Sequence, residues 1–394
     1  MTEKLYYTQP KCSEWETSIT HITQEDDYYL VTLKETAFYP EGGGQPADQG
    51  FIDHINVIDV IEKDHRIYHK VLTKPSINRV TCKIDDHRRF DHTQQHTGQH
   101  LLSAVLIELF DIETVSFHLG TDTVTIDINT KEITDQQILE VEQKVNQYIY
   151  DDIEIKTYFV QKDELSSLQL RKTPSVTEDI RIVEIKGIDV SACCGTHVIH
   201  TGQLGLIKIV KTEKVKGNTR VHFKCGYRAL EDYRQTSTIL NDISHHLSSN
   251  REAVLSNLKK LELEHRNLQK ELEEVKEKNN QFLVQQLLAE HPEKVISLSF
   301  TDRSLKDLQS LSRHFVSRVV VFQSLLDKKL LLSHDGLIDF HCGQFFKEHL
   351  KQYHGKGGGN ALSSQASFDD IQDLEQFAKF TESAVIEKMA AVNQ

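Results

Sequence analysis

The feature that most limits the fold is a long stretch without proline, from Tyr227 to Glu290, which Pro292 ends. Apolar side chains recur along it at alternating spacings of four and three residues, at Leu247, Val254, Leu258, Leu261, Leu268, Leu272, Val275 and Phe282. This spacing places them on one stripe of a helix and is typical of a coiled coil. We therefore expect a long helix over residues 227–291, as a coiled coil or a helical hairpin. A two-helix layer packed on a neighbouring domain would give a similar pattern.

Residues 1–87 are rich in short segments in which apolar and polar residues alternate. Alternation with a period of two predicts strands, and the clearest examples are Tyr28–Leu33, Ile55–Ile61 and Arg79–Ile84. Turn residues separate these segments, notably in Pro40–Pro46. The beginning of the chain therefore predicts a small β-barrel.

Helical and strand patterns alternate from residue 88 to residue 226. Apolar residues follow helical spacing from about residue 91 to residue 110, and strand patterns recur up to about residue 225. Residues 292–394 predict a small α/β domain with a flexible stretch, Gly355–Asn360, between two helices. The fold class is therefore α+β, with four expected domains: 1–87, 88–226, 227–291 and 292–394.

Composition excludes several classes of protein. The chain has 394 residues, of which 38% are hydrophobic, so it can bury more than one core. Its longest apolar runs, such as Leu101–Leu109, are too short to cross a bilayer, and its N-terminus lacks the pattern of a secretory signal. The six cysteines are scattered without a disulfide framework. We therefore expect a soluble, cytoplasmic protein with no membrane partner.

Two pairs of potential metal ligands stand out by their spacing. His96 and His100 are four residues apart on a predicted helix, so both rings point to one side. Cys193 and His197 are also four residues apart, in a compact loop around a glycine. Zinc prefers thiolate and imidazole ligands, so the two pairs together predict a zinc site.

The residues around the first pair limit the chemistry of such a site. His92 lies one turn earlier on the same helix face, so geometry alone leaves two adjacent histidine pairs open. A zincin needs a glutamate directly after its first histidine, but the residues here are Thr97, Gly98 and Gln99. None of these can act as a general base. A metal-bound water or the substrate's own hydroxyl group must therefore supply the activation.

The formal net charge of −13, taken alone, argues against a nucleic-acid partner. The charges are unevenly distributed, however. Only Glu213 opposes seven basic residues between positions 208 and 228, which are Lys208, Lys211, Lys214, Lys216, Arg220, Lys224 and Arg228. A run of like charges is usually one solvated face of a strand, and the segment by itself favours this interpretation.

Three motifs together resemble a known family. His96–Leu102, Cys193–His197 and Phe38–Pro46 occur in the order and approximate spacing of the AlaX family of alanyl-tRNA editing proteins, and the editing half of alanyl-tRNA synthetase is similar. Gly355–Asn360 resembles the glycine-rich stretch of the DHH-associated domain that ends those synthetases. The resemblance covers nearly the whole chain in the long arrangement of the family: barrel, editing domain, long helices and C-terminal domain.

The resemblance implies roles for particular residues. It implies that Zn²⁺ is bound by His96, His100, Cys193 and His197. Cys194 stands where the family more often has glycine, and the family spacing of four residues before the histidine favours Cys193 as the ligand. Contacts with the acyl group of the substrate are implied for Gly42, Gly43, Gly44, Gln45, Phe117 and His118. For the glycines, a tight barrel turn with positive φ is an alternative.

The function that the resemblance implies is a trans-editing hydrolase that deacylates alanine tRNA carrying serine or glycine. A synthetase pocket for alanine cannot readily exclude these two amino acids, so a second site that hydrolyses the error is the remedy. The implied tRNA contacts are the seven basic residues of segment 208–228 and Lys356. Because the barrel begins within the first residues, we expect no aminoacylation domain before it. A homodimer could form through the long helices or the C-terminal domain.

Two other classes of function differ from this one in the metal site that they need. A non-catalytic tRNA-binding protein with a structural zinc would use the same four ligands, because a closed four-ligand site is usual for structural zinc. A metal-dependent nuclease or phosphatase would place several carboxylates around a hard cation, and the motifs contain none.

Overall fold

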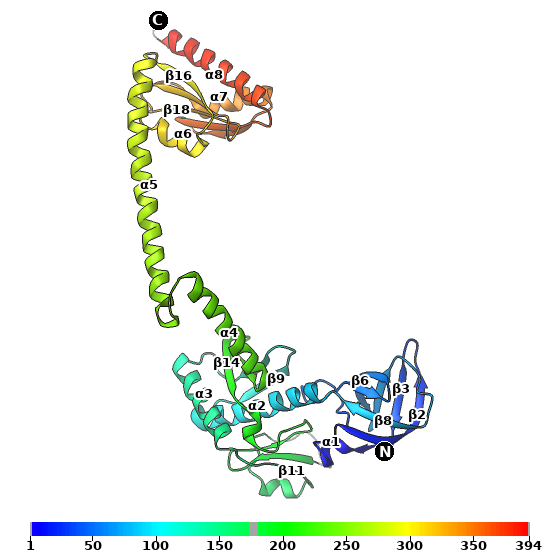
Figure 1. Ribbon diagram of the computed structural model, residues 1–394. Coiled ribbons are helices and arrows are strands. Elements are labelled where there is room, and N and C mark those ends of the chain that lie inside the picture. Colours follow the sequence, from blue (N-terminus) through cyan, green and yellow to red (C-terminus); the bar gives the residue numbers. More distant parts are fainter. Residues whose placement is uncertain (1, 173–179, 393–394) are drawn as a thin grey trace. The chain divides into compact units, whose positions relative to one another are not determined.

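The computed structural model describes residues 2–172 and 180–392 and has the mixed α+β architecture that the sequence predicts. Its described residues include eight α-helices and several β-sheets (Figure 1). They fall into two compact units, residues 1–243 and 244–394. In the described ranges, no helix is both long enough and apolar enough to cross a membrane.

Six strands build the first part of the N-terminal unit. Each is hydrogen-bonded to the next, and the last pairs back with the first to close a barrel, in the order β2 (Glu14–Gln24), β3 (Tyr29–Leu33), β7 (Arg66–Val71), β6 (Ile55–Lys63), β5 (Gly50–Ile52) and β8 (Arg79–Ile84). Along β8, the side chains of Val80, Cys82 and Ile84 are buried and alternate with exposed ones. Two short strands, β1 (Glu3–Lys4) and β4 (Glu35–Thr36), pair with each other, and helix α1 (Leu5–Thr8) follows β1.

Helix α2 (Asp86–Phe110) follows the barrel directly. The carboxylate of Asp85 caps it by accepting a hydrogen bond from the backbone N–H of Arg88 at 3.0 Å. The helix therefore begins earlier than about residue 91, where the apolar pattern placed its start. Its first six residues, Asp86 to Asp91, are polar apart from Phe90, so hydrophobic spacing could not reveal them.

Two antiparallel sheets complete the N-terminal unit. The first has the order β14 (Ile207–Val215), β15 (Asn218–Cys225), β10 (Val124–Ile128) and β9 (Thr114–Leu119). The second has the order β11 (Ile155–Val160), β12 (Ile180–Ile185) and β13 (Asp189–Ala192). Both sheets share one hydrophobic core with α2 and with helix α3 (Asp135–Tyr150). This packing brings the loop after β13 against the middle of α2.

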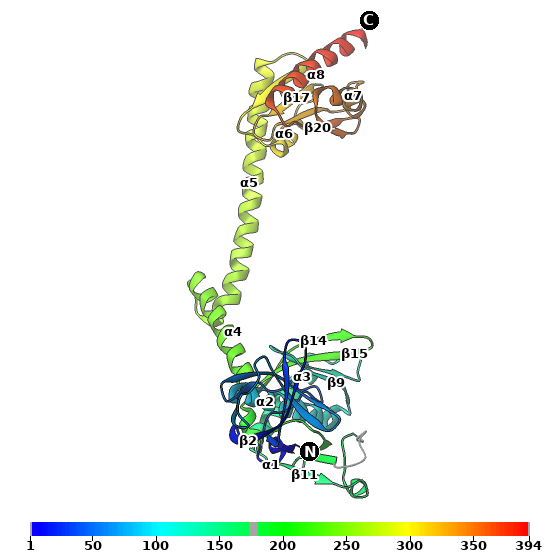
Figure 2. The ribbon, with the colours of Figure 1, turned by 90° about the vertical axis from the view of Figure 1, so that its right-hand side faces the viewer.

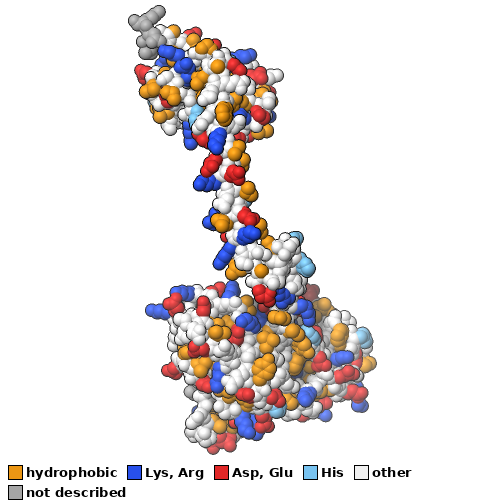
Figure 3. Space-filling model, turned by 60° about the vertical axis from the view of Figure 1, so that its left-hand side comes forward, with side chains coloured by type: hydrophobic (Ala, Val, Ile, Leu, Met, Phe, Trp, Pro, Cys, Tyr) orange, Lys and Arg blue, Asp and Glu red, His pale blue; other side chains and the backbone are white. Residues whose placement is uncertain are grey.

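The proline-free stretch forms two helices, α4 (Tyr227–His246) and α5 (Val254–Glu290), with the short 3-10 helix η3 (Arg251–Ala253) before α5. Stripe residues of α5 are exposed, with 45% of Leu258, 63% of Leu268 and 57% of Val275 accessible. Figure 3 shows hydrophobic and charged side chains mixed along this helix. The single chain therefore does not show the expected coiled coil.

A five-stranded sheet forms the centre of the second unit, in the order β16 (Val295–Phe300), β17 (Val319–Ser324), β18 (Lys329–His334), β20 (Ser363–Ser367) and β19 (Lys356–Gly359). Val319 and Val321 face one core, which they share with helices α7 (Cys342–His349) and α8 (Ile371–Val392). Val320 and Phe322 face another core, which includes α6 (Leu305–Ser312) and the end of α5. Figure 2 shows α6 beside α5 in this unit. The sheet thus separates two cores.

The glycine-rich stretch Gly355–Asn360 was expected to be flexible, and this expectation is wrong for most of it. Residues Lys356–Gly359 form the edge strand β19, which pairs with β20 in register from Lys356 opposite Ser367. An added Cβ at Gly357 would lie 2.1 Å from the carbonyl oxygen of Gln365. The glycines therefore allow a close approach of two backbones rather than a loose loop.

A buried ion pair joins α2 to the barrel. The side chains of Arg89 and Asp48 are in contact and are 7% and 1% exposed. Arg89 also donates to the carbonyl oxygen of Ala37, and Asp48 accepts a hydrogen bond from the backbone N–H of Tyr39 at 2.7 Å. Removing one partner would leave the other charge buried without compensation.

We therefore predict that Asp48→Ala lowers the free energy of unfolding by about 3–5 kcal/mol. The matched control is Glu16→Ala, which breaks an ion pair with Arg79 whose side chains are 62% and 80% exposed and should change this free energy by less than about 1 kcal/mol. Urea unfolding followed by the fluorescence of Trp15, the only tryptophan of the chain, measures both. Equal effects of the two variants would contradict the prediction.

Candidate metal centre

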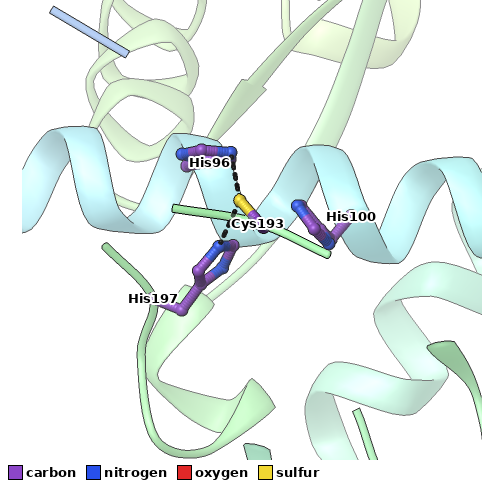
Figure 4. Close-up of side chains that lie close together, drawn as sticks. All are labelled: His96, His100, Cys193 and His197. Atoms are coloured by element: carbon purple, nitrogen blue, oxygen red, sulfur yellow. Dashed lines mark hydrogen bonds between the residues drawn. The ribbon is translucent and has the colours of Figure 1, made fainter. Parts of the chain in front are cut away.

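Four side chains from two segments far apart in the sequence converge on one point. His96 and His100 come from adjacent turns of α2, and Cys193 and His197 come from the loop after β13 (Figure 4). Their ligand atoms all lie within 4.8 Å of one another. The Cys193 Sγ atom is 3.4 Å from both His96 Nε2 and His197 Nε2. Since the nitrogen and sulfur ligands of a tetrahedral zinc lie about 3.5 Å apart, these residues fit the ion.

Each histidine of the group holds a second partner through its Nδ1 atom. His96 Nδ1 is 2.9 Å from Gln45 Oε1, and His100 Nδ1 is 3.1 Å from Asp189 Oδ2. These two oxygens can only accept hydrogen bonds, so both rings carry a proton on Nδ1. The Nε2 lone pairs of His96 and His100 are therefore free for a metal. Metal-binding histidines in proteins are usually fixed in this way.

The loop that carries Cys193 and His197 is held by contacts with several neighbouring segments. Arg181 Nη1 donates to the carbonyl oxygens of Cys193 and Gly195 at 2.8 and 2.9 Å. Thr97 Oγ1 lies 3.1 Å from His197 Nδ1. An added Cβ at Gly195 would lie 2.1 Å from the His96 ring, so only glycine permits this approach. The positions of both loop ligands are therefore fixed by the fold.

The electrostatic environment of Cys193 and His197 favours the protonation states that a divalent metal selects. Burial acts to raise the pKa of the Cys193 thiol, but His96, His197 and His100 hold that pKa well below its usual range. Burial lowers the pKa of His197 to about 3, which keeps its imidazole neutral. A thiolate and neutral imidazoles are the ligand forms that bind zinc.

A cavity of about 470 Å³ opens beside this group of residues. His96, His100 and Cys193 line it, together with Gly43 and Phe117. The Phe117 ring stacks on the His96 ring with a centroid separation of 5.2 Å. The cavity is large enough for a small ligand, and three of the four candidate metal ligands face it.

The glycine-rich loop contributes to the site in two different ways. Gly43 lines the cavity, and Gly44 packs so closely on Phe117 that an added Cβ would lie 2.8 Å from its ring. Gly42 and Gln45 are joined by backbone hydrogen bonds in both directions, and φ is positive at Gly43 and Gly44. The loop is thus also a tight turn, which is the alternative that the sequence left open, and contact of its glycines with an acyl group stays a prediction.

Two residues predicted to contact the acyl group lie elsewhere. Gln45 is fully buried, and its Oε1 atom accepts hydrogen bonds from His96 and from the backbone N–H of Thr196. It therefore lies behind the candidate metal ligand and does not line the cavity. His118 is exposed and also does not line the cavity, although its neighbour Phe117 does.

Most of the basic segment 208–228 is engaged in ion pairs. Arg228 is held by Asp91, with Nη2 2.6 Å from Oδ2, and by the carbonyl oxygen of Gly120. The remaining pairs with the shortest contacts are Lys208 with Glu142, Arg220 with Asp127 and Lys224 with Asp232.

Lys211, Lys214 and Lys216 are exposed around the turn of the β14–β15 hairpin, where Lys211 lies 3.7 Å from Glu213 and Lys214 lies 3.3 Å from Glu132. Lys356 is exposed on β19, 3.9 Å from Asp369. These four lysines are the predicted tRNA contacts that the fold leaves most accessible.

His92, left open by the spacing on α2, is buried but is not part of the four-residue group. Sequence reasoning missed Asp189, Arg171 and Arg181. The period of a strand places Asp189, Ser191 and Cys193 on one face, and this signal could have linked the carboxylate to the site.

Residues 180–222, which include β12 to β14 and the first part of β15, match the family described as the Threonyl and Alanyl tRNA synthetase second additional domain. The chain is 33% identical over 380 residues to the alanyl-tRNA editing protein AlaX-L of Pyrococcus horikoshii, which covers 91% of this chain and 93% of that protein. It is 38% identical over 209 residues to the alanyl-tRNA editing protein Aarsd1 of Rattus norvegicus, covering 52% and 50% of the two chains. It is 29% identical over 399 residues to the alanine–tRNA ligase of Pyrococcus furiosus, covering 95% of this chain and 43% of the ligase.

The geometry predicts different roles for the two adjacent cysteines. Cys193→Ser should lower zinc affinity by more than about 100-fold, because a hydroxyl replaces the thiolate at the centre of the group. Cys194→Ser should leave zinc affinity within about threefold of wild type, since Cys194 is exposed at the edge of the cavity. Zinc content after dialysis and chelator competition measure both variants. Loss of zinc in Cys194→Ser alone would show that Cys194, and not Cys193, is the ligand.

Proposed function

Because this chain belongs to the AlaX family of alanyl-tRNA editing proteins, we propose that it is a zinc-dependent hydrolase that removes serine or glycine wrongly attached to alanine tRNA. The observation that carries the proposal is the convergence of four ligand atoms within 4.8 Å beside a cavity of about 470 Å³. Three of the four ligands line that cavity, so a metal bound there would be accessible to a substrate.

Zinc bound by these residues would supply Lewis acidity at the acyl ester carbonyl. The chain's own contribution is to fix the ligands of the metal. The described residues that line the cavity include no Asp or Glu. We infer that the metal or a hydroxyl of the substrate activates the nucleophile. Lys172 and Arg181 give the described lining a positive charge that suits a tRNA end, whereas Asp189 compensates the charge of Arg171.

A non-catalytic tRNA-binding protein with a structural zinc is the second candidate. Four protein ligands are the usual number for structural zinc, and this observation favours it. The cavity against three of the ligands favours catalysis, since structural sites are normally closed to substrate. Zinc binding without hydrolysis would distinguish the second candidate from the first.

The remaining parts of the proposal concern organisation and partners. We propose the four-domain division at residues 1–87, 88–226, 227–291 and 292–394, with action in the cytoplasm. The accessible lysines of the hairpin turn and Lys356 would contact tRNA. The exposed apolar stripe of α5 would pair with a second copy of the chain, as a coiled coil.

We predict that wild-type protein deacylates seryl-tRNA for alanine and spares correctly charged alanyl-tRNA. His96→Ala and His100→Ala should each lower the rate on seryl-tRNA by more than about 100-fold, because each removes a metal ligand. His92→Ala is the matched control, since His92 is a buried histidine of the same helix outside the group. Release of labelled serine measures all four proteins. Wild-type rates in both ligand variants would refute the catalytic role.

We also predict that changing Lys211, Lys214 and Lys216 together to Gln flattens the salt dependence of tRNA binding. Each lost phosphate contact lowers the slope of log K against log salt by about 0.7–0.9, so the slope should fall by about 2–3. The control is Lys208→Gln, because Lys208 is already paired with Glu142 at 2.7 Å. Filter binding at several salt concentrations measures the slopes. An unchanged slope in the triple variant would show that the three lysines do not contact tRNA phosphates and that the hairpin turn is an ordinary solvated surface.

A further inference from the structure

His100 is the one member of the candidate metal group whose ring contacts a carboxylate in the described structure. Its Nδ1 atom is 3.1 Å from Asp189 Oδ2, and the two side chains are 5% and 1% exposed. Asp189 lies on β13, across the site from α2. A buried carboxylate in this place can fix both the tautomer and the rotation of the ring.

Asp189 is itself held from two further directions. Arg171 Nε donates to Asp189 Oδ1 at 2.7 Å, and Arg171 Nη2 lies 3.4 Å from Oδ2. Ser191 Oγ donates to Asp189 at 2.9 Å. Without these partners the carboxylate would be buried beside only one imidazole. The guanidinium of Arg171 therefore compensates the negative charge of Asp189, which orients His100.

Arg171 also reaches the cavity. Its side chain is 17% exposed, and it lines the cavity next to Lys172. Both are cations, but Lys172 is exposed and is not among the residues that hold Asp189. The two neighbours thus separate two possible roles of a positive charge here: attraction of an anionic substrate, and support of the carboxylate behind the metal ligand.

We propose that Arg171 and Asp189 are a positioning pair that fixes His100 for metal binding. This inference rests on the proposed function insofar as the group binds a metal. The pair acts as a unit, because Asp189 orients His100 and the hydrogen bonds from Arg171 hold Asp189 in place. Neither residue is a metal ligand, and neither needs to touch the substrate for this role.

The test compares Asp189→Asn, Arg171→Gln and the double variant with Lys172→Gln as the matched control. Zinc affinity by chelator competition should fall about 10–100-fold in each single variant, which is typical for partners of metal-bound histidines. The zinc affinity of the double variant should be no more than about threefold lower than that of the single variant with the lower affinity, because the two residues act together. Lys172→Gln, which removes the same charge from the cavity lining, should keep wild-type zinc affinity.

A spectroscopic readout separates positioning from general damage to the fold. The visible spectrum of the cobalt(II)-loaded protein reports ligand geometry, and it should change in Asp189→Asn and Arg171→Gln but not in Lys172→Gln. Ser191→Ala is a milder variant that removes one donor to Asp189 and leaves the ion pair. It should lower zinc affinity by less than either main variant, with an unchanged unfolding curve.

The outcomes distinguish this inference from the proposed function. Wild-type zinc affinity and cobalt spectra in both main variants would overturn the positioning pair, even if the enzyme is active. Equal losses in Arg171→Gln and Lys172→Gln would overturn it in favour of a simple charge effect. A wild-type protein that binds zinc without deacylating tRNA would refute catalysis and leave the pair intact. A wild-type protein that binds neither metal would overturn both.

Discussion

The structure of the N-terminal unit depends on satisfying the polar side chains that α2 buries. Along its first turns, side chains that would prefer water are almost fully enclosed: Arg89, His92, Thr93, Gln94, Gln95, His96, Thr97, Gln99 and His100. A buried polar group without a partner costs about 1–3 kcal/mol, so such side chains need specific neighbours, and His92, whose buried Nδ1 atom has no hydrogen-bond partner in the described structure, is an exception. The neighbours come from the barrel, from the loop after β13 and from the end of β15. Burial of this helix therefore specifies how those segments assemble around it.

Satisfying that helix also builds the candidate metal centre. Gln45 of the barrel turn accepts a hydrogen bond from His96 and holds Thr196, so the barrel and the metal loop meet at one amide. Thr97 Oγ1 lies 3.1 Å from Nδ1 of His197, on the face of α2 that the loop covers. Gly195 lets that loop come within contact of the His96 ring. The partners that stabilise the helix are thus the same contacts that orient the ligands.

The ligands could be predicted from the sequence, whereas their supporting residues could not. Pairs such as His96 with His100 are local, and helical geometry alone places both rings on one side. The contact of Gln45 with His96 spans 51 positions in the sequence and that of Asp189 with His100 spans 89, so both exist only once the chain has folded. The same limit explains why strand β19 (Lys356–Gly359) was not predicted. Its glycines indicate a flexible loop until the partner strand β20 is known.

The acidic net charge and a tRNA substrate are compatible because the charges are arranged locally. The cations between Lys208 and Arg228 mostly neutralise acids of the same unit, so the density of basic residues in the sequence overstates the free positive charge. The cavity differs in part: Arg171 there is paired with Asp189, whereas Lys172 and Arg181 line it without an ion-pair partner among the described residues. At physiological ionic strength a field reaches only about 8 Å, so the charges that act on what enters the cavity are those close to it. For the proposed substrate, such an arrangement would attract the acylated end of a tRNA and repel unrelated nucleic acid from most of the remaining surface.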